Sequence, residues 1–235
     1  MNRALPIVLL LFISSCSLKE SACGSTSTAG QAPTAITGEP AQDPSASGKV
    51  TLVFLGDSLT AGYQLLSNQA YPAKIGEMFE AEGYTNIDID NAGLSGDTSA
   101  GGLRRVEQLL TPATRILVIA LGGNDALRGL GVNETRENLR KIIDIGLQHG
   151  ASIMLCGMEG PTNLGEDYRT AFKQVYFDLL RAYQRQIVYV PFLLEGVAGR
   201  PELNQTDGIH PNEAGSKAIA EHLYPQLKDM VDRIQ

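Results

Sequence analysis

The chain has 235 residues, of which 43% are hydrophobic and 19% charged, and its formal net charge is −7. This composition is typical of an acidic globular protein with one substantial core. The charged residues comprise 26 acidic and 19 basic side chains, and tryptophan is absent, so neither charge nor base stacking favours a polynucleotide. We therefore expect no nucleic acid among its partners.

The first 16 residues have the pattern of an export signal. Arg3 supplies a positive charge, an apolar run from Ala4 to Ile13 follows, and small residues lead to Cys16. The Ile-Ser-Ser-Cys sequence ending there resembles the bacterial lipobox, where cleavage leaves a lipidated cysteine as the new N-terminus. We expect an exported protein anchored to the bacterial envelope, at the periplasmic face or the outer membrane if the cell is diderm. The alternative is a plain secretory signal cleaved nearby.

Residues 17–48 are rich in Ser, Thr, Ala, Gly and Pro and contain almost no large apolar side chains. Such a segment cannot bury enough surface to offset its ordering entropy, so we expect a disordered tether. Its r.m.s. reach as a flexible coil would be roughly 30 Å. We expect the folded domain at residues 49–235. Within it, Cys156 closes an apolar run and should be a buried thiol rather than part of a disulfide framework.

Beyond residue 48, short apolar runs alternate with longer segments of helical periodicity, which predicts an α/β fold: a parallel sheet with helices on both faces. The first and third runs are almost entirely apolar, as central strands are. The second alternates with aspartate and suits an edge strand. These features favour the flavodoxin-like order 2-1-3-4-5. The expected strands are Val50–Leu55, Ile87–Ile89, Ile116–Leu121, Ile153–Leu155 and Ile187–Val190.

The expected helices lie between and after these strands. Asn133 should cap the third helix, Gly150 should end it, and Pro211 should stand in the first turn of the last. His149 and His222 fall in helices, where we expect solvated positions. The sequence has no metal-type Cys/His spacing, P-loop or dinucleotide-binding glycine pattern. The expected helices are Tyr71–Gly83, Thr98–Leu110, Asn133–His149, Asp167–Tyr183 and Pro211 to the C-terminus.

Four short polar blocks stand out against this pattern. They are Gly-Asp-Ser-Leu-Thr at 56–60, Asn-Ala-Gly at 91–93, Gly-Gly-Asn-Asp at 122–125 and Asp-Gly-Ile-His-Pro at 207–211. We expect each of the first three to begin where a strand ends. In open α/β sheets, ligands bind beyond the carboxyl ends of the strands, where the strand order reverses. For order 2-1-3-4-5 that point lies between the first and third strands, so the blocks predict a site there.

The blocks contain the groups that ester hydrolysis through an acyl-enzyme requires. Ser58 would be the nucleophile and His210 the base. Asp207 is close enough in sequence to accept the Nδ1 proton of His210 and leave its Nε2 facing Ser58. The backbone N–H of Gly93 and the side-chain amide of Asn124 would bind the oxyanion. Taken singly, each block is also compatible with ordinary turn chemistry or, for Asp-x-x-His, with a structural hydrogen bond.

In this order and spacing, the four blocks resemble blocks I, II, III and V of the GDSL or SGNH hydrolases. Over residues 49–235 the sequence is similar to the bacterial acyl-CoA thioesterase I, arylesterase and lysophospholipase L1 group. The resemblance implies a three-layer α/β/α fold, no metal and no organic cofactor. It implies Ser58 as nucleophile, His210 and Asp207 as its partners, and the Ser58 N–H, Gly93 N–H and Asn124 side chain as oxyanion donors.

The resemblance also implies the substrate class, a small acyl ester or thioester of short to medium chain length. Some members of the group act on lysophospholipids. In that group the loop after the Asn block helps to cover the acyl chain, and here that loop is residues 126–132. The apolar candidates for the acyl pocket, all equally compatible with plain packing, are Leu127, Leu130, Met158, Pro161, Leu164 and Ile209.

Two other functions stay open. The same superfamily includes carbohydrate O-acetylesterases, which would act on envelope polysaccharide or peptidoglycan. A catalytically silent envelope-binding lipoprotein is the alternative from another class, and the intact Ser58, Asn124 and His210 argue against it. The lipobox and tether depart from the best-known soluble relatives, so a physiological role does not carry over from them. We expect a monomer that meets its substrate near a membrane.

Overall fold

The computed structural model describes residues 48–234. The predicted export signal, the lipobox Cys16 and all but the last residue of the predicted tether lie outside the described residues. The first strand, β1 (Val50–Gly56), begins two residues into them.

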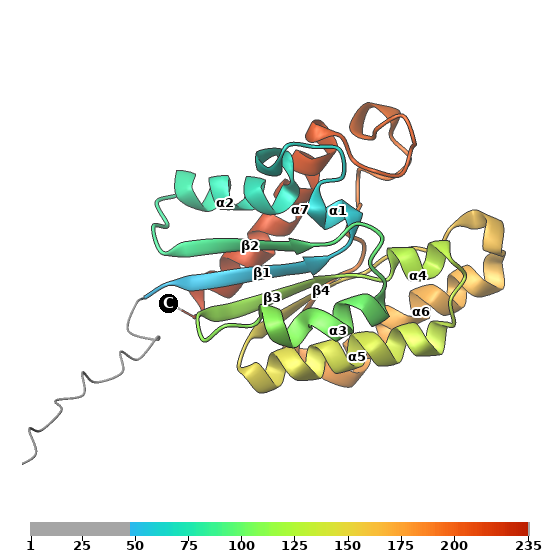
Figure 1. Ribbon diagram of the computed structural model, residues 1–235, viewed down its shortest axis with the longest axis horizontal. Helices are drawn as coiled ribbons and strands as arrows, with labels where there is room; N and C mark the ends of the chain where they lie inside the picture. The colour runs from blue at the N-terminus through green and yellow to red at the C-terminus, as the bar shows by residue number, and fades with distance from the viewer. Residues whose placement is uncertain (1–47, 235) are drawn as a thin grey trace, which may run out of the picture. The chain divides into compact units, whose positions relative to one another are not determined.

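The strands form one parallel sheet in the order β2-β1-β3-β4-β5, which confirms the predicted topology (Figure 1). β1 and β3 lie side by side near the middle of the sheet, and nearly every residue in them is buried, as their continuous apolar sequences predict. β2 is an edge strand, as predicted, and is largely half-buried or exposed. The remaining strands are β2 (Ile87–Gly93), β3 (Thr114–Ala120), β4 (Ser152–Cys156) and β5 (Ile187–Val190).

Helices cover both faces of the sheet, giving three layers (Figure 1). The helices α2 (Tyr71–Ala81) and α7 (Glu213–Asp232) pack together on one face. On the other face, α5 (Val132–His149) packs between α3 (Ser99–Leu109) and α6 (Glu166–Tyr183). Two short helices, α1 (Ser58–Ala61) and α4 (Gly123–Leu127), follow β1 and β3 at their carboxyl ends. None of the described helices is long and apolar enough to cross a membrane.

The core lies between the sheet and these two helical layers. On the α2 side, the Phe54 ring meets the edge of Tyr71 at a centroid distance of 5.8 Å. On the α5 side, Gly146 allows close packing, because a Cβ there would lie 2.6 Å from Ile153 and 2.9 Å from Leu117. Each fully buried large apolar side chain contributes about 1.5–3 kcal/mol. Cys156 is buried as predicted, and burial raises the pKa of its thiol to about 12, so the thiol stays protonated at neutral pH.

Most element boundaries differ from the sequence predictions by one or two residues, and the differences in β2, α7 and α5 bear on the site or on a predicted cap. β2 runs on to Gly93, because its pairing with β1 continues to the register Gly56 with Gly93; the second block therefore lies inside a strand rather than after it. The last helix begins at Glu213, with Asn212 as its cap. Pro211 is instead bridged to Asn204, outside the helix.

The third predicted helix starts earlier than expected. It begins at Val132, after Gly131, and Asn133 lies inside it rather than capping it. The Asn133 side chain accepts a hydrogen bond from Arg136, one turn further on. Its carboxyl end is as predicted: Gly150 ends the helix in the left-handed conformation, with φ of 88°.

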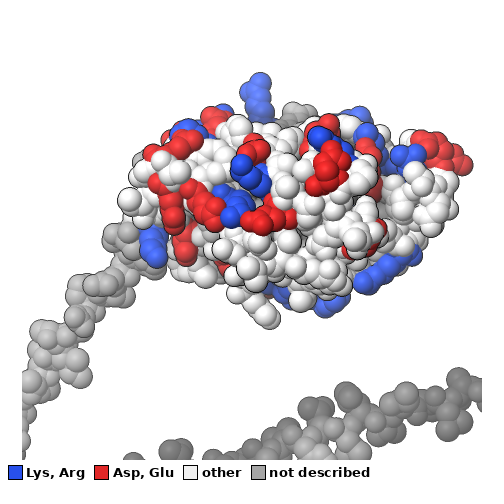
Figure 2. Space-filling model, turned by 90° about the horizontal axis from the view of Figure 1, so that it is seen from above, with Lys and Arg blue, Asp and Glu red and all other residues white. Residues whose placement is uncertain are grey.

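Figure 2 shows the face that carries α2 and α7, where acidic and basic side chains are interspersed. Ion pairs such as Lys74 with Glu77 and Lys228 with Glu82 account for part of this mixture. This face offers no continuous basic surface, in keeping with the net negative charge.

Candidate active site

The nucleophile turn is built from β1 and α1. Asp57 caps α1, its Oδ1 accepting a hydrogen bond of 3.0 Å from the Leu59 N–H. Ser58 is therefore the first residue of a helix that is only four residues long. The turn is tied down by Thr60, whose buried hydroxyl lies 2.8 Å from the hydroxyl of Tyr71 on α2. Ser58 is thus held at the carboxyl end of a central strand, where the sequence places it.

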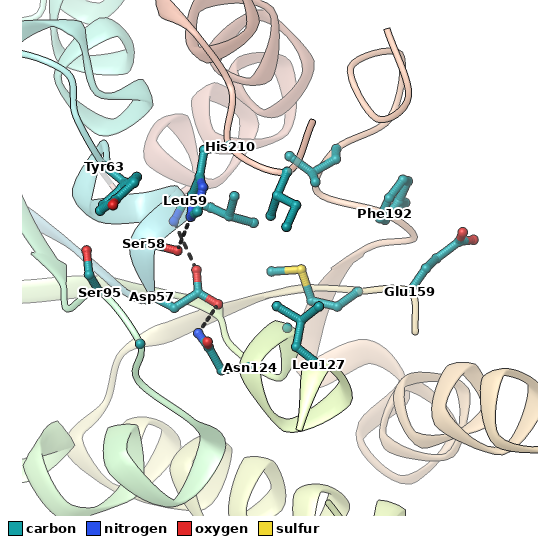
Figure 3. Close-up of a pocket in the computed structure, with 15 residues that line it drawn as sticks. Asp57, Ser58, Leu59, Tyr63, Ser95, Asn124, Leu127, Glu159, Phe192 and His210 are labelled. Atoms are coloured by element: carbon teal, nitrogen blue, oxygen red, sulfur yellow. Dashed lines mark hydrogen bonds between the residues drawn. The ribbon is translucent and has the colours of Figure 1, made fainter. Parts of the chain in front are cut away.

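Ser58, His210 and Asp207 form a continuous hydrogen-bonded chain. The His210 Nε2 lies 2.9 Å from the Ser58 Oγ, although 152 positions separate the two residues (Figure 3). The His210 Nδ1 lies 2.7 Å from the Asp207 Oδ2. Since a carboxylate only accepts, Nδ1 carries the proton and Nε2 presents its lone pair to the serine hydroxyl. The structure therefore brings together the three residues predicted to act as nucleophile, base and orienting acid.

Asp207 is held in its ionised form by its own loop. Its Oδ1 accepts the backbone N–H of Ile209 at 2.9 Å and of His210 at 3.0 Å. The hydrogen bonds from the His210 backbone and side chain, and from the Ile209 backbone, lower the pKa of Asp207 to about 2. The carboxylate consequently stays charged at neutral pH and continues to orient the imidazole.

Two residues that the sequence did not single out fix the histidine loop. The Gln205 side chain donates to the carbonyl of Tyr63 at 2.7 Å and to that of Pro211 at 3.0 Å. The Tyr63 ring lies over the His210 ring, with centroids 4.5 Å apart. Together these contacts join the loop after α1 to the loop before α7. No local pattern marks Gln205, because its partners lie far away in sequence or act through backbone atoms.

Asn124 lies beside the nucleophile turn, on α4. Its side-chain nitrogen donates to the Asp57 Oδ2 at 3.3 Å (Figure 3). One of its two N–H groups is thereby used, and the other is available to a ligand. Burial raises the pKa of Asp57 to about 6, against the opposing effects of the Leu59 backbone hydrogen bond, nearby His210 and the Asn124 hydrogen bond. Asp57 therefore links the helix cap to the predicted oxyanion donor.

The turn that carries Asn124 is held by the buried Asp125. Its carboxylate accepts hydrogen bonds from the Ser99 N–H at 2.8 Å, the Ser99 hydroxyl and the Thr135 hydroxyl at 3.2 Å. These partners lie on α3 and α5, so one side chain connects α4 to both neighbouring helices. A buried carboxylate with several donors is well satisfied.

Gly93 does not occupy the position predicted for it. Its N–H donates to the Asn91 side chain at 3.0 Å, and it is not among the residues that line the cavity at the site. A glycine is required there because a Cβ would lie 2.2 Å from the Ala61 N, in the backbone of α1. The prediction of Gly93 as an oxyanion donor is therefore not supported. Its amide already donates to the Asn91 side chain, and the side of Gly93 where a Cβ would stand is covered by α1.

Gly96 lies where Gly93 was expected. It lines the cavity together with Ser58 and Asn124, in the turn that follows β2. Within residues 48–234, no acceptor is found for its backbone N–H. Its φ of 82° is in the left-handed region that favours glycine. The sequence contains a signal for this donor, because Gly96 is a second glycine only three residues after Gly93.

The cavity beside Ser58 has a volume of about 370 Å³ and is mainly apolar. Of the six predicted pocket residues, Leu127, Met158 and Ile209 line it, whereas Leu130, Pro161 and Leu164 do not. Three apolar lining residues were not predicted: Leu59, Phe192 and Leu194. The last two follow β5, whose carboxyl end faces the same edge of the sheet. In the described part of the chain, no group of three or more His, Cys, Asp or Glu side chains is arranged to hold a metal ion.

The sequence of the chain is similar to those of known hydrolases. The model of the GDSL-like Lipase/Acylhydrolase family matches residues 54–218. Esterase TesA of Pseudomonas aeruginosa is 40% identical over 184 residues, covering 77% of this chain and 89% of the relative. Thioesterase 1/protease 1/lysophospholipase L1 of Escherichia coli K12 is 36% identical over 183 residues, covering 77% and 85%.

Solved structures agree with these relatives. The crystal structure of TesA superposes with a TM-score of 0.71 at 39% identity, covering 77% of this chain and 99% of that one. The crystal structure of AlinE4, a SGNH-hydrolase family esterase, gives a TM-score of 0.63 at 38% identity, covering 77% and 96%. The fold is therefore that of the SGNH hydrolases, and the chain belongs to the GDSL-like lipase/acylhydrolase family.

Proposed function

We propose that this protein is a serine hydrolase that cleaves esters or thioesters of short to medium acyl chains through an acyl-Ser58 intermediate. The observation that carries the proposal is the hydrogen-bonded chain from Ser58 through His210 to Asp207, which opens onto an apolar cavity. The curated relatives include proteins named esterase, thioesterase and arylesterase, which is consistent with this chemistry.

In the acylation half of the reaction, the His210 Nε2 takes the proton of the Ser58 hydroxyl as the oxygen attacks the carbonyl carbon of the substrate. The negative charge develops on the carbonyl oxygen. When the tetrahedral intermediate collapses, the bond to the leaving alcohol or thiol breaks and the imidazolium returns the proton to it. Asp207 stabilises the imidazolium that forms between these two proton transfers.

In the second half, water replaces the leaving group. His210 takes a proton from the water while the water oxygen attacks the acyl-Ser58 carbonyl carbon. The imidazolium then gives the proton to the Ser58 oxygen as the bond to the acyl group breaks and the free acid departs. The same donors stabilise both oxyanions, because both tetrahedral intermediates place their oxygen in the same position relative to Ser58.

The proposed oxyanion donors are the N–H groups of Ser58 and Gly96 and the side chain of Asn124. The Ser58 N–H is at the first turn of α1, where helix amides favour negative charge. Gly96 replaces Gly93 in this set because its amide has no acceptor within the described residues and because it lines the cavity. Removing one such donor costs about 10²–10³ in kcat.

The acyl chain is proposed to occupy the apolar end of the cavity. Leu127 and Phe192 lie on one side of the Ser58–His210 pair, together with the charged Glu159, whereas Tyr63 and Ser95 lie on the other (Figure 3). The apolar side suits a hydrocarbon chain, and the side with Ser95 suits a polar leaving group. The cavity volume of about 370 Å³ lies within the range of small-molecule sites.

The nucleophile is tested by Ser58→Ala in the full-length chain, with p-nitrophenyl butyrate and hexanoate as substrates. We expect kcat to fall by at least about a thousandfold, because the acyl-enzyme cannot form. Ser67→Ala is the matched control, since Ser67 is exposed on the surface. A Ser58→Ala variant that kept most of its activity would show that another group is the nucleophile.

A chain-length series from acetyl to decanoyl esters tests the substrate class. A rise in kcat/KM from acetyl toward medium chains supports the acyl-chain assignment of the apolar cavity. Activity confined to acetyl esters would instead favour the carbohydrate O-acetylesterase. Absence of turnover and of labelling by a fluorophosphonate would favour the catalytically silent lipoprotein.

Export, lipidation of Cys16 and attachment to the cell envelope belong to the same proposal, and their support comes from the sequence of the first 16 residues. A tether of 32 residues between a lipidated Cys16 and the start of the folded part would leave the hydrolase domain free to approach substrates at or near the membrane. We further propose that the protein acts as a monomer, since each of the proposed catalytic groups comes from a single chain.

A further inference from the structure

Arg105, on α3, contacts three segments around the site through one guanidinium group. Its Nη2 donates to the Gly56 carbonyl at 3.0 Å and its Nη1 to the Ala92 carbonyl at 2.7 Å. Its Nε donates to the Asp97 carboxylate at 2.8 Å. The side chain is only 20% exposed, and that of Asp97 only 7%. A planar fork of donors can hold three acceptors in fixed directions, which a lysine ammonium cannot do.

The two carbonyls lie at the ends of strands that lead directly into the site. Gly56 is the last residue of β1 and precedes Asp57 and the Ser58 nucleophile. Ala92 is the second-last residue of β2, before the turn that contains Gly96. Arg105 therefore connects the segment that carries the nucleophile to the segment that carries the proposed oxyanion amide.

The turn between β2 and α3 depends on the same contacts. Its first residue, Leu94, donates its N–H to the Gly56 carbonyl at 3.0 Å, and the Asp97 N–H donates to the Leu94 carbonyl at 3.0 Å. The Asp97 side chain lies against Gly101, where a Cβ would stand 1.6 Å from its Oδ1. This close approach leaves Asp97 little freedom, so its bond to Arg105 fixes the residue that directly follows Gly96.

We propose that Arg105 is a positioning residue for ester hydrolysis, which sets the Gly96 amide relative to the Ser58 hydroxyl. It does not line the cavity and so acts through the two segments rather than on the substrate. The inference rests on the proposed function. Nucleophile and oxyanion donor act on the same transition state, so loosening their relative position lowers kcat more than it changes KM.

The test is Arg105→Lys in the full-length chain, with kcat and KM measured on p-nitrophenyl hexanoate. The lysine keeps the positive charge opposite Asp97 and loses the fork that reaches both carbonyls. We expect kcat to fall about tenfold to a hundredfold with KM changed by less than about twofold. The matched control is Arg104→Lys, because Arg104 is the exposed neighbour on the same helix and should leave both parameters unchanged.

A second variant separates positioning from folding. In Arg105→Ala, added guanidinium ion at concentrations that do not unfold the protein should restore part of the lost kcat, whereas equal sodium chloride should not. The folded fraction of each variant is measured by circular dichroism under the assay conditions. The inference is overturned if Arg105→Lys keeps the wild-type kcat, or if the losses match the unfolded fraction. Failure of the proposed function looks different, because the wild type would then show no Ser58-dependent turnover.

Discussion

At the scale of single residues, Asp57 has a central position in the site. One of its carboxylate oxygens caps α1, which presents Ser58, and the other accepts the Asn124 side chain. The sequence suggested only that this residue belongs to a turn. The Asp57 carboxyl group is buried, which disfavours its charged form and raises its pKa to about 6.

The raised pKa predicts how stability depends on pH. Asp57 has a pKa of about 6 in the folded state against an ordinary value of 3.8, so the folded state binds its proton more tightly. The resulting stabilisation is fully present below pH 3.8 and is lost as pH rises through about 6. The expected loss is about 3 kcal/mol in the free energy of unfolding.

Urea unfolding of the wild type and Asp57→Asn, measured between pH 4 and pH 7, checks this prediction. The wild type should lose stability relative to the variant over this range, because only the wild type can ionise at this position. A difference in unfolding free energy that stays constant with pH would show that Asp57 titrates with an ordinary pKa.

At the scale of elements, the site depends on how closely β2 approaches α1. Gly93, the last residue of β2, lies against the backbone of Thr60 and Ala61. The short α1 cannot hold its own position, because four residues form too little helix to be stable alone. Its placement comes from this contact, from the Asp57 cap and from the Thr60 bond to Tyr71.

Gly93→Ala should therefore damage both folding and activity. The added Cβ would lie 2.2 Å from the Ala61 N, so α1 must shift and carry Ser58 away from His210. We expect a destabilisation of about 1–3 kcal/mol by thermal or urea unfolding, together with a lower kcat. Gly131→Ala is the control, because a Cβ there meets nothing within 4 Å. Normal stability and kcat in Gly93→Ala would contradict the assigned contact.

Much of the element arrangement could be predicted from the sequence. β1 and β3 could be predicted as central strands because both their faces are buried and their sequences are continuous apolar runs. β2 could be predicted as an edge strand because aspartates alternate with apolar residues along it. The end of β2 could not be predicted, since Asn-Ala-Gly reads as a turn and only pairing with β1 keeps it extended. The start of α7 could not be predicted either, because Pro211 suits both the first turn of a helix and the bridge to Asn204 that it forms.

The candidate site divides in the same way. Ser58, Asp207 and His210 could be predicted because they belong to two short sequence blocks, at 56–60 and 207–211, whose residue types and spacing are characteristic. Gly96 could not be distinguished from Gly93 as the oxyanion donor, because both are glycines in the same short segment and residue type alone does not show which amide faces the cavity. The contacts of Arg105 could not be predicted, since its main acceptors are backbone carbonyls, which leave no trace in residue types.

At the scale of the whole molecule, the mouth of the cavity is notably apolar. Several exposed large apolar side chains of the described part belong to its lining, namely Tyr63, Leu127 and Ile209. An open apolar mouth is compatible with substrates that carry hydrocarbon chains. A domain tethered to a membrane through lipidated Cys16 would meet such substrates at high local concentration.

The anchor is tested by Cys16→Ala, expressed in a bacterium that processes lipoproteins. We expect the wild type in the membrane fraction and the variant outside it, because the variant cannot receive the acyl chains. Esterase activity of the domain on soluble p-nitrophenyl butyrate should be equal in the two. If the two proteins fractionate alike, Cys16 is not the anchor and the signal is a plain secretory one.

The central claim is that Ser58 is the nucleophile activated by His210. It is tested most directly by reacting the protein with a fluorophosphonate and locating the adduct by peptide mass spectrometry. The account predicts one adduct per chain, on Ser58, with labelling strongly slowed in His210→Ala. An adduct on another residue, or no adduct on a folded protein that hydrolyses esters, would contradict it.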